Sequence, residues 1–362
     1  MARRNSIHNT IALLSSICWP ALGIASSQEI SAQPTSTPQL WITNAHGNDV
    51  HIYEIGSWQL LDEIKVGNQP HGISATADGR IAHLSIENVD AKNGELVWID
   101  TQSRRIISRL QVGPEPHDIE CTPDGRWIYV PCNDGTWWIV DGEQKRVVKT
   151  IETGGRPHNT TISPDGRYMY LSPMGLKTRV NGKKEYLGPA AVTIVDIEND
   201  HRVIDRIPFS DHPRPAALSA DGRLLFQSVD QLEGFEIADI AARQVIARVT
   251  HTINPELEDR DTRCHGLAIP PGRSEIWCCD VDRHRVHVHE TESGSYEQLA
   301  TIVLIGRPYW ITFSDDGNYA FISIRSEGVV AVIETDSRKV LRHLKAGDTP
   351  KRTQVLNVPS DS

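Results

Sequence analysis

A pattern of nine or ten residues recurs six times along the chain and constrains the fold more than any other feature of the sequence. Each copy starts with Pro, or once with Cys, continues through a short apolar run and ends on Gly after Asp or Pro. The copies are residues 70–79 (PHGISATADG), 116–125 (PHDIECTPDG), 157–166 (PHNTTISPDG), 213–222 (PRPAALSADG), 264–272 (CHGLAIPPG) and 308–317 (PYWITFSDDG), and a truncated seventh begins at Pro350. Successive copies are 41 to 56 residues apart, which is typical of a repeat architecture.

Within a repeat, the apolar runs are short, alternating and rich in β-branched residues, as at 126–130, 136–140 and 146–151. Such runs, separated by Gly, Asn or Asp, predict strands rather than helices. The Asp-Gly pairs supply the positive φ that a tight hairpin turn needs. We therefore expect four strands per repeat, which is one blade of a β-propeller.

The seventh repeat is split between the two ends of the chain. Its inner strand is expected at residues 352–358, and its three other strands at 40–44, 49–54 and 58–64. Pairing the C-terminal strand with the N-terminal strands would close the ring and remove exposed sheet edges. The predicted fold is an all-β, seven-bladed β-propeller with four-stranded blades over residues 40–358.

The repeat also resembles a known family. A Gly-x-x-Pro-x-x-Ile/Leu-x-x-Ser-Pro-Asp-Gly-Arg-x-x-Tyr-Val run, followed by a strand that carries Ile-Asp or Val-Asp (Asp100, Asp141, Asp196), is similar to the YVTN-repeat β-propellers. The resemblance covers about residues 40–358 and implies the propeller fold. It leaves function open, because this family and its relatives include binding propellers, lactonases, dehydrogenase heavy subunits and copper-site oxidoreductases.

Residues 1–32 have the pattern of an export signal. Arg3 and Arg4 precede a mostly apolar stretch at 11–25, and small residues end the segment at Ser31 and Ala32. The stretch is too short to span a membrane well. The paired arginines also match a twin-arginine signal loosely, so either export route is open. We expect a flexible lead-in at 33–39, a tail at 359–362, and a periplasmic or secreted protein with no membrane span.

The net charge of −10, with Lys and Arg scattered along the sequence, argues against nucleic acid as a partner. Neutralising phosphates would require a basic stripe. We expect a monomer whose partner is a small-molecule ligand or a protein, bound at one face of the ring.

The residue after each repeat's Pro or Cys is expected at the mouth of the central channel, once per blade. In blade order these residues are His71, His117, His158, Arg214, His265, Tyr309 and Lys351. A single polar residue there needs no function, since the position faces water. Four imidazoles among seven positions indicate a site.

One hypothesis is a pocket without a metal, which either only binds its ligand or catalyses a lyase or cyclase reaction. His71, His117, His158 and His265 would then act as acid and base near neutral pH. Arg214, Tyr309 and Lys351 would bind a small polar or anionic ligand, helped by three loop residues on the same face (Asp230, Asp280 and Arg325). No cofactor is firmly implied.

The alternative is a copper-dependent periplasmic oxidoreductase in which the same four histidines are metal ligands. Imidazole is a common ligand of copper and zinc. Residues 115–118 (EPHD) also resemble, at the level of the fold, the copper propellers of the nitrous oxide reductase type. The paired His-His of those enzymes is absent here.

Five cysteines remain after the export signal: Cys121, Cys132, Cys264, Cys278 and Cys279. If each repeat's hairpin turn is regular, Cys132 lies opposite His117, Cys278 opposite His265 and Cys279 opposite Cys264. These groups could be soft-metal ligands, or one disulfide with buried thiols. For His287 and His289, which alternate on one expected strand away from the channel, we predict a surface or blade-packing role.

Two long connections are expected on the channel-mouth face. They are an insertion at residues 173–188 and a lengthened connection at 251–261. Long loops on one face of a rigid scaffold form lids or partner surfaces, or remain solvated.

Overall fold

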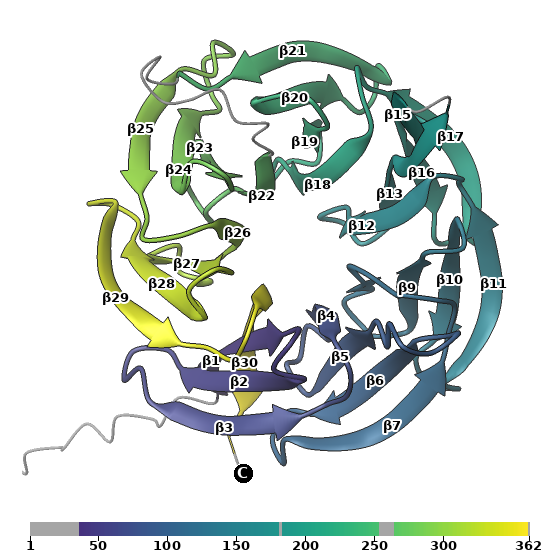
Figure 1. The fold of residues 1–362 in the computed structure, drawn as a ribbon, viewed down its shortest axis with the longest axis vertical. Helices are drawn as coiled ribbons and strands as arrows, with labels where there is room; N and C mark the ends of the chain where they lie inside the picture. The colour runs from purple at the N-terminus through teal and green to yellow at the C-terminus, as the bar shows by residue number, and fades with distance from the viewer. Residues whose placement is uncertain (1–35, 181–182, 253–263, 361–362) are drawn as a thin grey trace, which may run out of the picture. The chain divides into compact units, whose positions relative to one another are not determined.

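The structure, a computed structural model, describes residues 36–180, 183–252 and 264–360. The export signal expected at residues 1–32 lies outside these ranges. Seven four-stranded antiparallel sheets form a ring around a central channel, as Figure 1 shows. The predicted seven-bladed β-propeller is therefore confirmed. Among the described residues, no helix is long and apolar enough to cross a membrane.

Each blade runs outward from an inner strand at the channel to an outer strand at the rim. Blade one contains β4 (Pro70–Ala75), β5 (Ile81–Ile86), β6 (Glu95–Asp100) and β7 (Arg105–Gln111). Blade two contains β8 (Glu120–Cys121), β9 (Trp127–Cys132), β10 (Thr136–Asp141) and β11 (Arg146–Glu152). Blade three contains β12 (Arg156–Ile162), β13 (Tyr168–Met174), β16 (Ala191–Asp196) and β17 (Arg202–Pro208).

The next three blades repeat this order. Blade four contains β18 (Pro213–Leu218), β19 (Leu224–Val229), β20 (Gly234–Asp239) and β21 (Gln244–Thr250). Blade five contains β22 (Cys264–Ala268), β23 (Glu275–Asp280), β24 (Arg285–Glu290) and β25 (Gln298–Val303). Blade six contains β26 (Pro308–Phe313), β27 (Tyr319–Ile324), β28 (Val329–Glu334) and β29 (Lys339–Lys345).

Blade seven joins the two ends of the chain, as expected. Its inner strand is β30 (Pro350–Pro359), which pairs with β1 (Ser36–Asn44) and through it with β2 (Asp49–Glu54) and β3 (Leu60–Lys65). Leu40 pairs with Val355 in this closing contact. β1 begins at Ser36, so the strand includes part of the segment expected as a lead-in.

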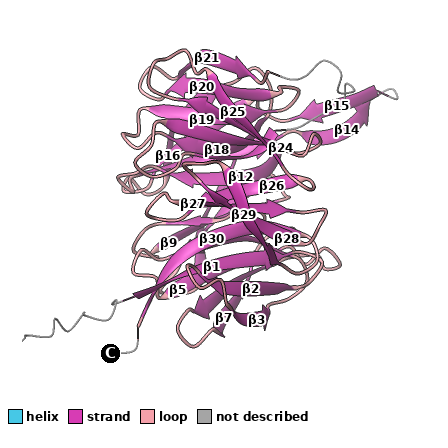
Figure 2. Cartoon of the chain, turned by 90° about the vertical axis from the view of Figure 1, so that its left-hand side faces the viewer, coloured by secondary structure: helices cyan, strands magenta, loops and turns pink. Residues whose placement is uncertain are grey.

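The insertion in blade three forms a hairpin of its own, made of β14 (Leu176–Val180) and β15 (Lys183–Leu187). Figure 2 shows it projecting beyond the blades, on the side opposite the C-terminal end of β30. The hairpin lies on the channel-mouth face, because it connects the second and third strands of blade three. Most of the connection expected at 251–261 falls outside the described residues.

Buried apolar side chains fill the space between neighbouring blades. The described residues form seven such clusters, one at each blade interface. Trp137 is fully buried against blade three, and Trp138 packs toward blade one. Alternation along each strand thus sends successive side chains to different interfaces.

The inner hairpin turns lie on the face opposite the channel mouth and are built alike. In five blades a Thr or Ser hydroxyl donates a hydrogen bond to the Asp carboxylate two residues later, in the pairs Thr76 and Asp78, Thr122 and Asp124, Ser163 and Asp165, Ser219 and Asp221, and Ser314 and Asp316. The turn glycines of six blades have φ between 68° and 74°, as the Asp-Gly pattern predicts.

A β-bulge near the channel end of the inner strand is the feature that the sequence analysis missed. The register shifts in blade one between Pro70 and Ile73, and similar shifts occur in five other blades. A bulge puts two residues opposite one and redirects side chains. Consecutive residues on the inner strand can therefore both face the channel.

The cysteine pairings predicted from regular turns are wrong. In blade two the register is the predicted one at Glu120–Tyr129 and Cys121–Ile128, but the inner strand begins only at Glu120, and the His117 amide donates to the carbonyl oxygen of Pro131 instead of lying opposite Cys132. In blade five Cys264 pairs with Asp280, and Cys278 pairs with Leu267. The blade-five hairpin is longer than the predicted turn, and the bulge shifts the register again. All five described cysteines are free, buried thiols, so the disulfide alternative is not present in the structure.

Candidate functional site

The residues predicted at the channel mouth form a continuous row of contacts. The imidazole of His71 lies 3.6 Å from that of His117 between ring centroids, and His117 lies 4.2 Å from His158. His158 is 5.7 Å from His265, whose ring stacks on Tyr309 at 4.0 Å. Lys351 extends the row at its other end, with Nζ 2.9 Å from His71 Nδ1. Side chains from six blades thus meet at the channel end of the inner strands.

A pocket of about 440 Å³ opens at this row. It is lined by His117, Arg156, His158, Met174, Arg214, His265, Val281, Asp282, Tyr309 and Arg325. The lining includes five of the predicted channel-mouth residues. His71 and Lys351 are not part of it and lie behind His117, buried beside Glu87.

Burial determines the charge of the imidazoles. Loss of solvation lowers the pKa of His117, His158 and His265 well below its usual value, and nearby cationic groups lower it further. The three rings are therefore neutral at pH 7. A neutral imidazole can accept a proton or bind a metal, which its charged form cannot do.

The hydrogen bonds of His265 and His117 fix which ring nitrogen is free. Nδ1 of His265 lies 2.9 Å from the carbonyl oxygen of Tyr309, and Nδ1 of His117 lies 3.2 Å from that of His158. A carbonyl oxygen only accepts, so Nδ1 carries the proton in both neutral rings. Nε2 of each ring consequently has a free lone pair.

Positive charge at the pocket comes from three arginines on three blades. Arg214 is buried and ion-paired with Asp230 at 2.7 Å, and its Nη1 points toward the Met174 sulfur at 3.3 Å. Arg156 pairs with Glu115 at 2.9 Å. Arg325 is exposed at the rim, with its guanidinium 5.5 Å from the centre of the Tyr309 ring. Within the described residues, no carboxylate lies in ion-pair range of Arg325.

A second polar layer lies immediately below the imidazoles. Arg352 is fully buried, pairs with Asp118 at 3.0 Å and lies 3.4 Å over the Trp310 ring. Asn159 donates a hydrogen bond to the same Asp118 carboxylate. Each of these residues directly follows a channel-mouth residue in sequence, which the bulge permits. In this layer the Asp118 carboxylate matches the charge of Arg352.

The structure places the other predicted site residues differently. Asp230 does not line the pocket, but it holds Arg214. Asp280 is buried against Arg283 and His287, at 3.6 Å and 3.3 Å. His287 and His289 are buried on β24, in agreement with blade packing and not with a surface role.

Several pocket residues were not predicted. Arg156 directly precedes the repeat's Pro, and Asp118, Asn159 and Arg352 directly follow the channel-mouth residue. The repeat register could have identified these positions, had the bulge been known. Met174 ends β13, next to the blade-three insertion, and Asp282 lies on the connection between β23 and β24, and no repeat pattern determines the course of either connection.

The ligand atoms at the channel do not form a three-imidazole metal site. Among the described residues, the group within 4.8 Å of one another there consists of one atom each from His71, Glu87 and His117. Copper would thus have two imidazoles and a carboxylate.

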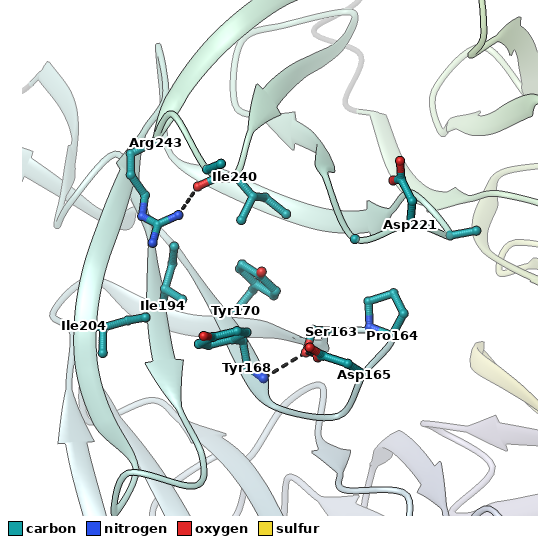
Figure 3. A pocket seen from close by; sticks show the side chains of 13 residues that line it. Ser163, Pro164, Asp165, Tyr168, Tyr170, Ile194, Ile204, Asp221, Ile240 and Arg243 are labelled. Carbon is teal, nitrogen blue, oxygen red and sulfur yellow. Dashed lines mark hydrogen bonds between the residues drawn. The ribbon is translucent and has the colours of Figure 1, made fainter.

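A larger cavity of about 620 Å³ lies at the hairpin-turn face between blades three and four (Figure 3). Its walls include Tyr168, Tyr170 and Ile240. Its polar groups are engaged locally: Ser163 accepts from the Tyr168 amide, and Arg243 donates to the Ile240 carbonyl. The channel mouth, with its free lone pairs and exposed arginine, is the better candidate.

Comparisons with known proteins agree with the propeller fold. The Cytochrome D1 heme domain family matches residues 84–174, which is well under half of the chain. No curated protein matches the sequence. The matched residues include His117, Arg156, His158 and Met174 of the pocket.

Solved structures with similar folds have low sequence identity. Hydrazine synthase of Kuenenia stuttgartiensis is 20% identical with a TM-score of 0.68, over 82% of this chain and 92% of that chain. The periplasmic gluconolactonase of Pseudomonas aeruginosa is 17% identical with a TM-score of 0.70, over 90% and 100%. A dihydro-heme d1 dehydrogenase in complex with DHE is 15% identical with a TM-score of 0.64, over 93% and 77%. At these identities the likeness concerns the fold alone, and the YVTN-repeat assignment stays a prediction.

Proposed function

We propose that this chain is an exported β-propeller that binds a carboxylate-bearing small molecule at the channel mouth. One observation carries the proposal: arginines from three blades line the same pocket as three neutral imidazoles, in a chain of net charge −10. The planar guanidinium group matches a carboxylate with two parallel hydrogen bonds. Export is supported by the signal-like N-terminus and by the periplasmic gluconolactonase of similar fold.

The imidazoles give this binding site groups for acid–base chemistry. The free Nε2 lone pairs of His117 and His265 can accept a proton from a ligand held by the arginines, as a lyase or cyclase requires. A simple binding module would use the same atoms only as hydrogen-bond acceptors.

A second candidate is an iron-bearing tetrapyrrole as the bound ligand. The match to the Cytochrome D1 heme domain family and the likeness to a dihydro-heme d1 dehydrogenase support this ligand class. The residues fit the group, because neutral imidazoles with free Nε2 atoms can ligate iron. His117 or His265 would hold the iron, and Arg156, Arg214 and Arg325 the carboxylates. The iron would supply redox or ligand-binding chemistry.

Titration of the full-length mature protein tests both candidates. The probes are citrate, gluconate and iron protoporphyrin IX, followed by calorimetry and, for the tetrapyrrole, by its visible absorption. We expect a carboxylate probe to bind and Arg325→Ala to weaken binding about tenfold or more, since a charged hydrogen bond contributes about 1.5–3 kcal/mol.

Arg273→Ala is the matched control, because Arg273 pairs with Asp336 away from the pocket and its loss removes the same charge. The proposal is wrong if no probe binds or if both arginine variants bind as the wild type does. Tetrapyrrole binding that changes its absorption on His265→Ala would favour the second candidate. Copper that co-purifies and is lost on His117→Ala would favour the oxidoreductase alternative.

A further inference from the structure

A cluster of thiols and imidazoles lies between blades four and five, away from the pocket. His251 follows the outer strand β21, Cys264 begins the inner strand β22, and Cys278 lies on β23. One potential ligand atom from each lies within 4.8 Å of the other two. All three residues are buried, with at most 4% of their surface exposed. None of them lines the channel-mouth pocket.

A chain of hydrogen bonds orients His251 toward the thiols. His289 Nδ1 lies 2.9 Å from the carbonyl oxygen of Tyr296, and its Nε2 lies 3.0 Å from His251 Nδ1. The carbonyl only accepts, so His289 donates from Nδ1 and accepts at Nε2. His251 must then donate from Nδ1, which leaves its Nε2 lone pair facing Cys264 Sγ at 3.1 Å.

This arrangement is the one that histidine ligands of metals adopt. Such a ligand donates its other ring nitrogen to a neighbouring acceptor, which fixes the tautomer and the direction of the ring. Here His289 provides the acceptor, and His287 stacks on His251 at 4.2 Å and holds it from the side. Both neighbours come from β24.

The surroundings of the thiols are apolar. Cys264 and Cys278 belong to the buried cluster between blades four and five, which also contains Phe226, Phe235 and Tyr296. The three ligand residues are almost fully buried, so a bound cation would lie in apolar surroundings. Soft sulfur ligands combined with imidazole select Zn²⁺ or Cu⁺ over the hard cations.

We propose that His251 Nε2, Cys264 Sγ and Cys278 Sγ bind one soft cation, Zn²⁺ or Cu⁺, between blades four and five. Binding exchanges the two thiol protons, which leave to solvent, for two metal–sulfur bonds, and no atom is oxidised or reduced. Ligand atoms around a tetrahedral metal are about 3.6 Å apart for bonds of 2.0–2.3 Å. His251 Nε2 now lies 3.1 Å from Cys264 Sγ, and no pair of the three ligand atoms is more than 4.8 Å apart, so binding needs only small side-chain movements.

The site would join two blades. His251 continues from blade four, whereas both cysteines belong to blade five. A cation held by all three therefore acts as a cross-link at this interface. Its role is structural, and it is independent of the ligand proposed for the channel.

Metal analysis of the full-length mature protein tests the proposal. The protein is incubated under reducing conditions with Zn²⁺, or with Cu⁺ in a parallel sample, and washed free of excess metal. We expect about one equivalent of one of these metals per chain, and at least a tenfold loss of affinity in Cys278→Ser and His251→Gln. Cys279→Ser is the matched control, because Cys279 is equally buried on the same strand but packs toward blade six.

Channel variants separate this site from the channel function. His117→Ala and Arg325→Ala should keep the metal, even if they lose the channel ligand. Loss of the metal in His117→Ala but not in Cys278→Ser would overturn the proposal and point to the channel instead.

Measurements on the unaltered protein guard against variants that fail to fold. Co²⁺ should give the thiolate charge-transfer absorption of a cysteine-bound metal, and one equivalent of Zn²⁺ or Cu⁺ should raise the unfolding temperature. Peptide mapping shows whether the thiols of Cys264 and Cys278 are free or joined in a disulfide. A Cys264–Cys278 disulfide in the protein as purified from its native compartment, or no binding of any of the three cations, would overturn the proposal.

Discussion

The two ends of the inner strands contrast with each other. At the hairpin-turn end, five blades repeat the same hydroxyl-to-Asp hydrogen bond, and six turn glycines share nearly the same φ. At the channel end, the corresponding positions carry His, Arg, Tyr and Lys. Repetition marks a residue that the backbone needs, whereas variation marks side chains that face a ligand. The contrast predicts different consequences for substitutions at the two ends.

The largest expected loss of stability comes from the channel end. Arg214→Ala leaves the Asp230 carboxylate, whose side chain is fully buried, without its ion-pair partner. Breaking a buried pair in this way costs about 3–5 kcal/mol of unfolding free energy. Denaturant unfolding measures it. The double variant Arg214→Ala/Asp230→Ala should recover much of the loss, and equal stability of the single and double variants would contradict this account.

Glu120, on the inner strand of blade two, should make the stability of the fold depend on pH. Burial raises the pKa of Glu120 to about 7, although Ser74 donates a hydrogen bond to its carboxylate. The folded state therefore keeps this proton between about pH 4.5 and 7, where the unfolded chain releases it. The contribution of Glu120 to the unfolding free energy should fall by up to about 3 kcal/mol as the pH rises through this range, whereas the buried histidines, whose pKa burial lowers, contribute the opposite trend.

Glu120→Gln should remove this contribution, so that the unfolding free energy of the wild type minus that of the variant falls as the pH rises, as measured by denaturant unfolding from pH 4.5 to 8. The dependence that remains in the variant comes from other buried groups, among them Asp118, whose pKa burial raises to about 6, and the channel histidines, whose pKa burial lowers. A pH profile identical to that of the wild type would show that Glu120 is not the group involved.

Substituting two glycines at the hairpin-turn end distinguishes the cost of backbone strain from the cost of a steric clash. Gly272 and Gly79 have the same φ of 69°, so Gly→Ala should cost about 1 kcal/mol at either position from conformation alone. A Cβ at Gly272 meets nothing, whereas one at Gly79 collides with the Asn357 carbonyl oxygen of β30. Thermal unfolding should show an additional loss of about 1–3 kcal/mol for Gly79→Ala. Equal losses would mean that the backbone moves aside.

The smallest effect is expected for the turn carboxylates. Asp221→Ala removes the hydrogen bonds from the Ser219 hydroxyl and the Arg223 amide, both at an exposed turn. The cost should be about 0.5–1.5 kcal/mol in unfolding experiments. Ligand binding at the channel should not change. A binding defect in this variant would remove the functional distinction between the two ends.

The sequence predicts the features that repeat. One pattern predicts the blade number, the split blade, the Asp-Gly turns and the set of channel-mouth residues. It can do so because every blade packs its four strands in the same way. His71, His117, His158 and His265 were found in this way without any fold-specific information about their surroundings.

The features that do not repeat could not be predicted. A shift of one residue in a hairpin turns every side chain to the other face of the sheet, so the bulge and the longer blade-five turn reversed the cysteine assignments. His251 follows the outer strand of blade four. No repeat position indicates that a residue there contacts a thiol of the neighbouring blade five. Met174 reaches the pocket from the end of β13, where the insertion begins, and Asp282 reaches it from the connection between β23 and β24.

The closing contact between β30 and β1 also sets the order in which the channel can be completed. Lys351 and Arg352 lie on β30, which is synthesised after every other described strand, whereas its partner β1 is made first. Contacts between residues so far apart in sequence form slowly. A nascent chain therefore carries its imidazoles without the two buried cations behind and beneath them, so ligand capture by the complete channel has to wait until the last strand has been inserted.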